Sequence, residues 1–99
     1  MTIEKTVNGS ALTLAVEGRL DTLTAPEMEA EISKSIDGIE SLVLDFSKLD
    51  YVSSAGLRVL LSAHKTMAAR KGMKVIHANE IVHEVFEVTG FSSILNIED

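Results

Sequence analysis

Two adjacent serines, Ser53 and Ser54, stand where a polar loop gives way to a helical pattern. Ala55 and Gly56 follow them, so the first turn of the expected helix consists of small residues. The unpaired N–H groups of a helix N-terminus, with about half a positive charge, favour an anion there. Gly56 costs about 1 kcal/mol of helix propensity relative to alanine, which favours a site where another molecule approaches. The simpler interpretation is a serine N-cap.

Other chemistries for these hydroxyls find little support in the sequence. A hydrolase would pair Ser54 with a histidine, but there is no Gly-x-Ser-x-Gly elbow, and His64 lies roughly three helical turns further along. His77 and His83 are interpreted like His64, as surface or core-edge side chains, and no two histidines have helical metal-ligand spacing. Without cysteines there is no thiolate catalysis or thiolate-ligated metal. We expect no catalytic residue, no metal and no cofactor.

The elements that precede the serines begin with a hairpin. Apolar and polar residues alternate over 2–7 and 11–17 on either side of Asn8-Gly9, which predicts two antiparallel strands. Residues 18–22 are expected to leave the sheet as a loop. A helix then begins near Thr24, which has capping-box spacing to Glu27, and ends at Gly38. The apolar run 42–44 predicts a central parallel strand buried on both faces.

The remaining elements follow the same alternation. Residues 46–52 are expected to form a loop, and the serine helix begins at Ser53 or Ser54 and ends at Gly72. Residues 73–77 predict a strand, and Asn79 caps a third helix that Gly90 closes. A final edge strand is expected over 94–97. The order ββαβαβαβ predicts an α/β fold with a mixed, mostly parallel sheet of four to five strands and three helices.

Composition restricts the class of protein further. The 99 residues suit one domain, and the net charge of −6 makes nucleic acid or an anionic membrane surface a poor partner. No apolar run is long enough to cross a bilayer, and the N-terminus lacks the pattern of a signal peptide. We therefore expect a cytoplasmic protein, without membrane insertion and monomeric.

Three segments of this chain resemble the STAS domain, and specifically the short anti-sigma factor antagonists of bacteria. The segments are Gly18-Arg19-Leu20-Asp21, Leu42-Val43-Leu44-Asp45 and Tyr51-Val52-Ser53-Ser54-Ala55-Gly56-Leu57-Arg58-Val59-Leu60. The resemblance covers nearly the whole chain, which it identifies as a single STAS domain over residues 1–99. It implies a partner-switching protein whose unphosphorylated form binds an anti-sigma factor, which is also a serine kinase, and so frees the sigma factor. Phosphorylation ends the binding, and a phosphatase restores it.

The resemblance also implies the residues of the switch. The family's phosphorylated serine lies two positions before the glycine of an Asp-Ser-Ser/Thr-Gly turn, which here is Ser54. Two residues depart from this pattern, because Ser53 replaces the aspartate and Ala55 replaces the following Ser or Thr. Ser53 is therefore the second candidate acceptor. The partner-binding residues expected from the motifs and their neighbours are Asp21, Thr22, Ser53, Ser54, Ala55, Gly56 and Arg58.

A phosphate on Ser54 would add about −1.5 to −2 charge at neutral pH. At a helix N-terminus that charge is tolerated, so it should act on the partner contact and leave the fold intact. Two alternatives stay open at this point. The chain could be a STAS subunit that docks onto a transporter or signalling scaffold, or it could be a nucleotide-binding STAS module, although it has no Walker loop.

Overall fold

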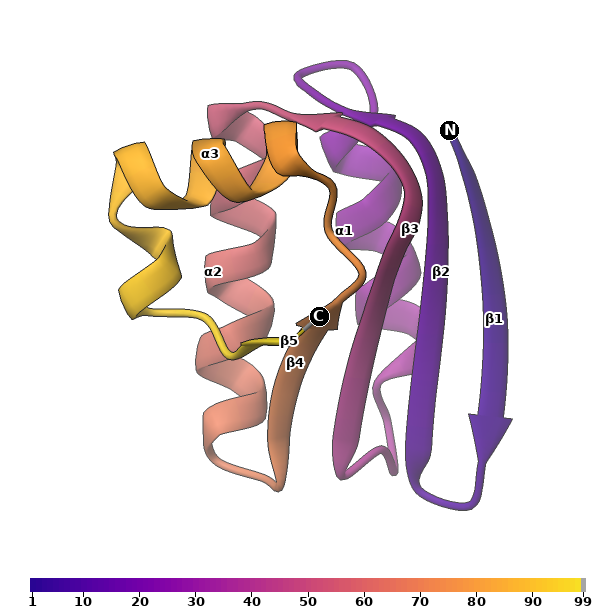
Figure 1. Cartoon of the computed structure of the whole chain (residues 1–99). Coiled ribbons are helices and arrows are strands. Elements are labelled where there is room, and N and C mark those ends of the chain that lie inside the picture. The colour runs from indigo at the N-terminus through magenta and orange to yellow at the C-terminus, as the bar shows by residue number, and fades with distance from the viewer. Residues whose placement is uncertain (99) are drawn as a thin grey trace.

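Five strands form one sheet in the order in which they occur along the chain (Figure 1). The computed structural model describes residues 1–98. Its elements are β1 (Thr2–Asn8), β2 (Ala11–Leu20), α1 (Ala25–Ser35), β3 (Ser41–Val52), α2 (Ser54–Ala68), β4 (Gly72–Ile76), α3 (Glu80–Thr89), a 3₁₀ turn η1 (Phe91–Ser93) and β5 (Ile97–Glu98). The pair β1–β2 is antiparallel, and the pairs β2–β3, β3–β4 and β4–β5 are parallel. The predicted order ββαβαβαβ is confirmed.

This strand order decides where the helices lie. From β2 to β5 each crossover moves one strand further in the same direction, so crossovers of one hand place their helices on the same face of the sheet. Figure 1 shows α1 and α2 side by side on that face, with α3 lying crosswise to α2 near the end of the sheet where β3 finishes. The core between the sheet and the helices contains Leu14, Leu44, Val75, Leu60 and Phe86, all fully buried.

The opposite face of the sheet is only half-covered, which corrects the prediction for residues 42–44. Leu42 and Leu44 are buried, but Val43 between them is only half-buried. The same alternation holds along β2 and β4. A parallel sheet usually has helices on both faces, but here all three crossovers go to one side.

Two strands are longer than the sequence predicts. β2 continues to Leu20, and β3 continues to Val52 through the segment 46–52 that was expected to be a loop. The register against β2 shifts twice, between Ala15 and Glu17 and between Gly18 and Arg19, so β3 carries an extra residue at each point. The apolar residues Phe46, Leu49 and Val52 are spaced by three, and each extra residue lets the next one face the core.

The helix boundaries agree with their sequence signals except at one cap. Asn79 caps α3, because its Oδ1 accepts a hydrogen bond from the Val82 N–H at 2.8 Å, and Gly90 ends the helix with a φ of 81°. The predicted capping box at Thr24 is wrong. The Thr24 side chain makes no cap hydrogen bond to α1, and its hydroxyl donates instead to the carbonyl of Arg19. The edge strand at the C-terminus is confirmed in place but shorter than predicted, at Ile97–Glu98.

Candidate functional site

The two serines occupy different positions at the start of α2. Ser53 is the N-cap, with an extended backbone (φ −98°, ψ 176°) and a hydroxyl that accepts from the Gly56 N–H at 3.5 Å. Ser54 is the first residue of the helix, and its side chain is exposed. Within residues 1–98 its hydroxyl has no hydrogen-bond partner. Ser53 therefore starts the helix, whereas Ser54 presents a free hydroxyl to solvent.

The turn that carries these serines is fixed to the end of β2. The backbone N–H of Ser53 donates to the carbonyl of Leu20 at 2.8 Å, and Leu20 pairs with Val52 in the sheet. Because Asp21 follows Leu20 directly, the loop that begins at Asp21 lies beside the serine turn. Asp21 and Ser54 therefore share one end of the sheet.

Gly56 is buried and makes this close approach possible. A Cβ added at this position would lie 2.7 Å from Leu20 Cγ, 2.9 Å from the Leu20 carbonyl oxygen and 2.9 Å from Val52 Cγ2. Any side chain would therefore push α2 away from the ends of β2 and β3. The glycine serves packing inside the protein, which replaces the sequence interpretation that it leaves room for an approaching molecule.

Asp21 organises the loop between β2 and α1. Its Oδ1 accepts hydrogen bonds from the backbone N–H groups of Thr24 at 3.1 Å and Leu23 at 3.0 Å, and from the Thr24 hydroxyl at 3.2 Å. The pKa of Asp21 lies below its ordinary value, first because the Thr24 N–H donates to the carboxylate and then because Leu23, the Thr24 hydroxyl and the charge of Arg19 add to this. The structure thus shows the Asp21 carboxylate holding its own loop, and its expected role in partner binding stays a prediction.

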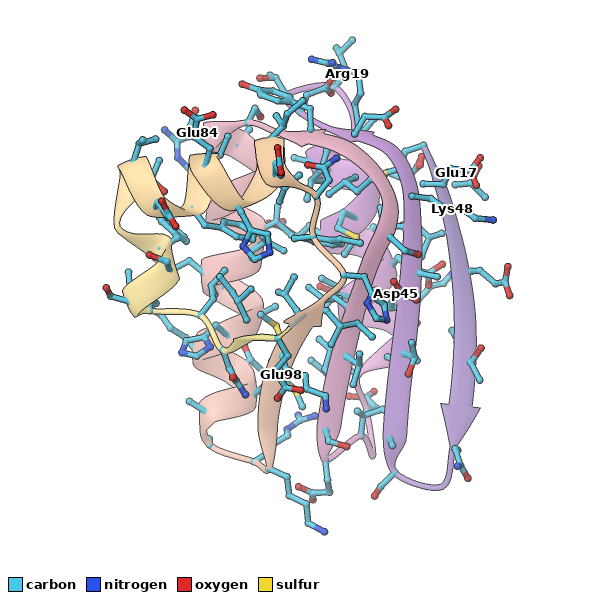
Figure 2. The ribbon with its side chains drawn as sticks, in the orientation of Figure 1. Glu17, Arg19, Asp45, Lys48, Glu84 and Glu98 are labelled. Carbon is cyan, nitrogen blue, oxygen red and sulfur yellow. The ribbon has the colours of Figure 1, made fainter. Side chains whose placement is uncertain are left out.

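Arg19 of β2 pairs with Tyr51 of β3 at the same end of the sheet, and Figure 2 shows Arg19 at that end. The guanidinium of Arg19 lies 4.7 Å from the centre of the Tyr51 ring, and its Nε lies 3.6 Å from Asp21 Oδ2. Val52 is fully buried beneath the turn, whereas Tyr51 is half-buried. The cation–π contact and the ion pair hold Arg19 across the loop.

An open hollow of about 240 Å³ separates the first turns of α1 and α2. Its lining residues are Thr22, Ala25, Pro26, Glu29, Ala55, Arg58 and Val59. Three predicted site residues, Thr22, Ala55 and Arg58, thus meet around one depression next to Ser54. Arg58 is exposed and has no ion-pair partner among residues 1–98. None of the histidines lines this hollow.

Leu23 is a further candidate site residue, which the sequence motifs do not mark. Its side chain is 89% exposed, although leucine is normally buried. It lies in the loop that Asp21 holds, beside Thr22. The signal was available, because Leu23 is the only large apolar residue between Asp21 and Thr24. A single exposed leucine is common on protein surfaces, so Leu23 counts as a candidate only because it lies beside Thr22, which lines the hollow.

The structure defines an α/β domain whose helices cover one face of a mixed sheet, with a polar loop and an exposed serine at one end. The STAS domain profile matches residues 2–99. The chain belongs to the STAS domain family.

Several proteins similar to this chain in sequence or in fold are named anti-sigma factor antagonists. BtrV of Bordetella bronchiseptica, a candidate anti-sigma factor antagonist, is 39% identical over 88 residues, which cover 87% of this chain and 76% of BtrV. The anti-sigma-B factor antagonist of Listeria monocytogenes is 31% identical, covering 85% of this chain and 75% of that protein. Unphosphorylated SpoIIAA, an anti-sigma factor antagonist, shares the fold with a TM-score of 0.82 at 19% identity, over 99% of this chain and 89% of SpoIIAA. Within residues 1–98, no helix has the length and apolarity to span a membrane.

Proposed function

We propose that this chain, acting as a single STAS domain and a monomer in the cytoplasm, is an anti-sigma factor antagonist. Its unphosphorylated form binds an anti-sigma factor that is also a serine kinase, and this binding releases the sigma factor. The kinase then phosphorylates Ser54 and ends the binding, and a phosphatase restores it. The chain itself catalyses no reaction in this scheme.

The accessible hydroxyl of Ser54 is the observation that carries this proposal. A kinase must reach the acceptor oxygen, and Ser54 is exposed at the first position of a 15-residue helix. Ser53 is half-buried, and its oxygen already accepts from Gly56. Of the two candidates, Ser54 therefore fits the acceptor role and Ser53 the cap. SpoIIAA, which has this fold, has been described in a phosphorylated form as well.

The proposed contact surface surrounds Ser54. It consists of the loop from Asp21 to Leu23, the exposed start of α2 and Arg58, on both sides of the hollow. Leu23 offers the apolar contact, and Asp21 and Arg58 offer charges of both signs. Ser53 and Gly56 contribute through the backbone, because they set the position of the turn.

The phosphate acts on the interface in this account. Placed at the first position of α2, a dianion lies near the positive end of the helix dipole, so the fold tolerates it. In the contact surface it brings like-charge repulsion or a desolvation cost of about 3–4 kcal/mol, which weakens binding roughly 100- to 1000-fold. That difference is large enough to switch partners.

The acceptor is tested by mass spectrometry after incubation with the candidate kinase and ATP. We expect one phosphate on the wild-type chain and on Ser53→Ala, and none on Ser54→Ala. Both variants remove one hydroxyl from neighbouring positions, so each is the control for the other. Phosphate on Ser54→Ala, or its loss from Ser53→Ala with the fold intact, would contradict the assignment.

A further inference from the structure

Helix α3 exposes apolar side chains that the fold does not use. Val82 and Phe86 are fully buried and attach the helix to the core. Ile81 and Val88, in contrast, are 56% and 76% exposed. They lie seven residues apart and therefore on the same side of the helix, with the half-buried Val85 between them. The three side chains form one apolar stripe, which we call the α3 stripe.

A row of carboxylates lies directly beside the α3 stripe. Successive residues of a helix are rotated by about 100°. On the side of Val88 that faces away from Val85, the next side chains around the helix are Glu84, Glu80 and Glu87. All three are exposed, and Figure 2 shows Glu84 on the outer side of α3. Residues 75–99 contain five acidic residues and neither lysine nor arginine. No lysine or arginine from this part of the sequence compensates the row.

We propose that the α3 stripe and its carboxylate row dock a basic amphipathic helix of a partner protein. The positions 81, 85 and 88 have the i, i+4, i+7 spacing at which one helix packs along another. The neighbouring row of three glutamates selects an occupant with Lys or Arg beside its apolar stripe. A second copy of this chain is a poor occupant, because it would bring Glu80, Glu84 and Glu87 against the same three residues. An anionic membrane is disfavoured for the same reason.

This surface is separate from the one around Ser54. The residues that line the hollow come from α1, α2 and the loop before α1, and α3 supplies none of them. Docking on α3 therefore does not depend on phosphorylation of Ser54. If the antagonist function proved wrong, the docking proposal for α3 could still be tested as described below.

The test uses the full chain, labelled with ¹⁵N, and two synthetic helical peptides of about 20 residues. One peptide has a leucine stripe flanked by lysines, and in the other each lysine is replaced by glutamate. We expect the lysine peptide to cause saturable NMR shift changes confined to α3 and its neighbours, and the glutamate peptide to cause none. We further expect Ile81→Ser combined with Val88→Ser, and separately Glu84→Lys, to weaken binding at least about tenfold.

Matched control variants lie on β1, at the opposite edge of the sheet. Val7 is 52% exposed, close to the value for Ile81, and Glu4 is exposed like Glu84. Val7→Ser and Glu4→Lys should leave the affinity unchanged. Equal losses in these controls would mean general attraction to an acidic protein and would overturn the proposal. So would shifts that map elsewhere, no saturable shift at millimolar peptide, or self-association of the free chain through α3.

Discussion

Gly56 shows how one missing side chain positions the serine turn. The atoms that a Cβ would meet include the carbonyl oxygen of Leu20, which belongs to the backbone and cannot turn aside. Alanine would gain about 1 kcal/mol of helix propensity but would meet an overpacking cost of about 1–3 kcal/mol. The contacts at 2.7–2.9 Å are too short for a real Cβ atom, so the overpacking cost should exceed the gain in helix propensity. We therefore expect Gly56→Ala to be less stable than the wild type.

The size of this effect is measured by urea unfolding. We expect the free energy of unfolding of Gly56→Ala to fall by about 1–2 kcal/mol. The control is Ser54→Ala, an exposed change two residues earlier in the same turn, which should alter it by less than about 0.5 kcal/mol. A Gly56→Ala protein as stable as the wild type would show that α2 does not depend on this close approach.

Asp21 predicts a pH dependence of the loop before α1. Its folded pKa is lowered from 3.8 by the Thr24 N–H and its neighbours, so the carboxylate form is favoured in the folded state. The carboxylate therefore stabilises the folded state fully above pH 3.8, its ordinary pKa. This stabilisation is lost as the pH falls through the lower pKa of the folded state. We expect the wild type to be more stable than Asp21→Asn near neutral pH, and the difference to shrink in acid. Unfolding curves of both proteins over this pH range measure it, and a difference that grows in acid would contradict it.

The sequence proposes the serines, Asp21, Thr22 and Arg58 as site residues, and the structure places them at one end of the sheet, around the starts of α1 and α2. The sequence could not tell Ser53 from Ser54 by role, since cap and first helical residue differ only in backbone geometry. It also assigned the cap of α1 to Thr24, whereas the Asp21 carboxylate accepts the Thr24 N–H. A hydroxyl can also bond within its own loop, and the capping-box spacing alone does not show that the Thr24 hydroxyl donates to the Arg19 carbonyl instead of capping α1.

The largest difference between the predicted and the observed elements is in β3, whose second half was expected to be a loop. Its second half has apolar residues every third position, and a regular strand needs them every second position. Two extra residues in the register against β2 reconcile the spacing with a continuous strand. The Asp45 carboxylate supports the first of them, because its Oδ1 accepts from the Ser47 N–H at 3.0 Å. Such irregularities depend on the neighbouring strand, so a periodicity within β3 cannot predict them.

The caps of α2 and α3 differ in strength, which gives a comparison of two helices. Asn79 accepts from Val82 at 2.8 Å and also donates from Nδ2 to the Leu49 carbonyl at 3.0 Å. Ser53 makes one cap contact, at 3.5 Å. We expect Asn79→Ala to lower the free energy of unfolding by about 1–2 kcal/mol and Ser53→Ala by about 0.5 kcal/mol. Urea unfolding of the two variants measures both, and the reverse order would show that bond geometry does not rank these caps.

At the scale of the whole molecule, the strand order brings the candidate site residues to one end of the sheet. All crossovers run one way, so the helices share a face, and the loops that follow β2 and β3 meet where the sheet ends. Alternation along the chain was enough to predict this architecture, because each strand–helix unit has its own start and stop signals. The coverage of only one face was not predictable, since an apolar run such as Leu42-Val43-Leu44 does not reveal how fully each side is covered.

In the proposed switch, the charge on Ser54 controls binding to an anti-sigma factor while the fold stays unchanged. The most direct measurement is isothermal titration calorimetry of the candidate anti-sigma factor with the chain unphosphorylated and phosphorylated on Ser54, with thermal unfolding of both forms alongside. We predict that phosphorylation weakens binding roughly 100- to 1000-fold and leaves the melting temperature equal or slightly higher. Equal affinity of the two forms, or loss of binding only because the phosphorylated chain unfolds, would contradict the account.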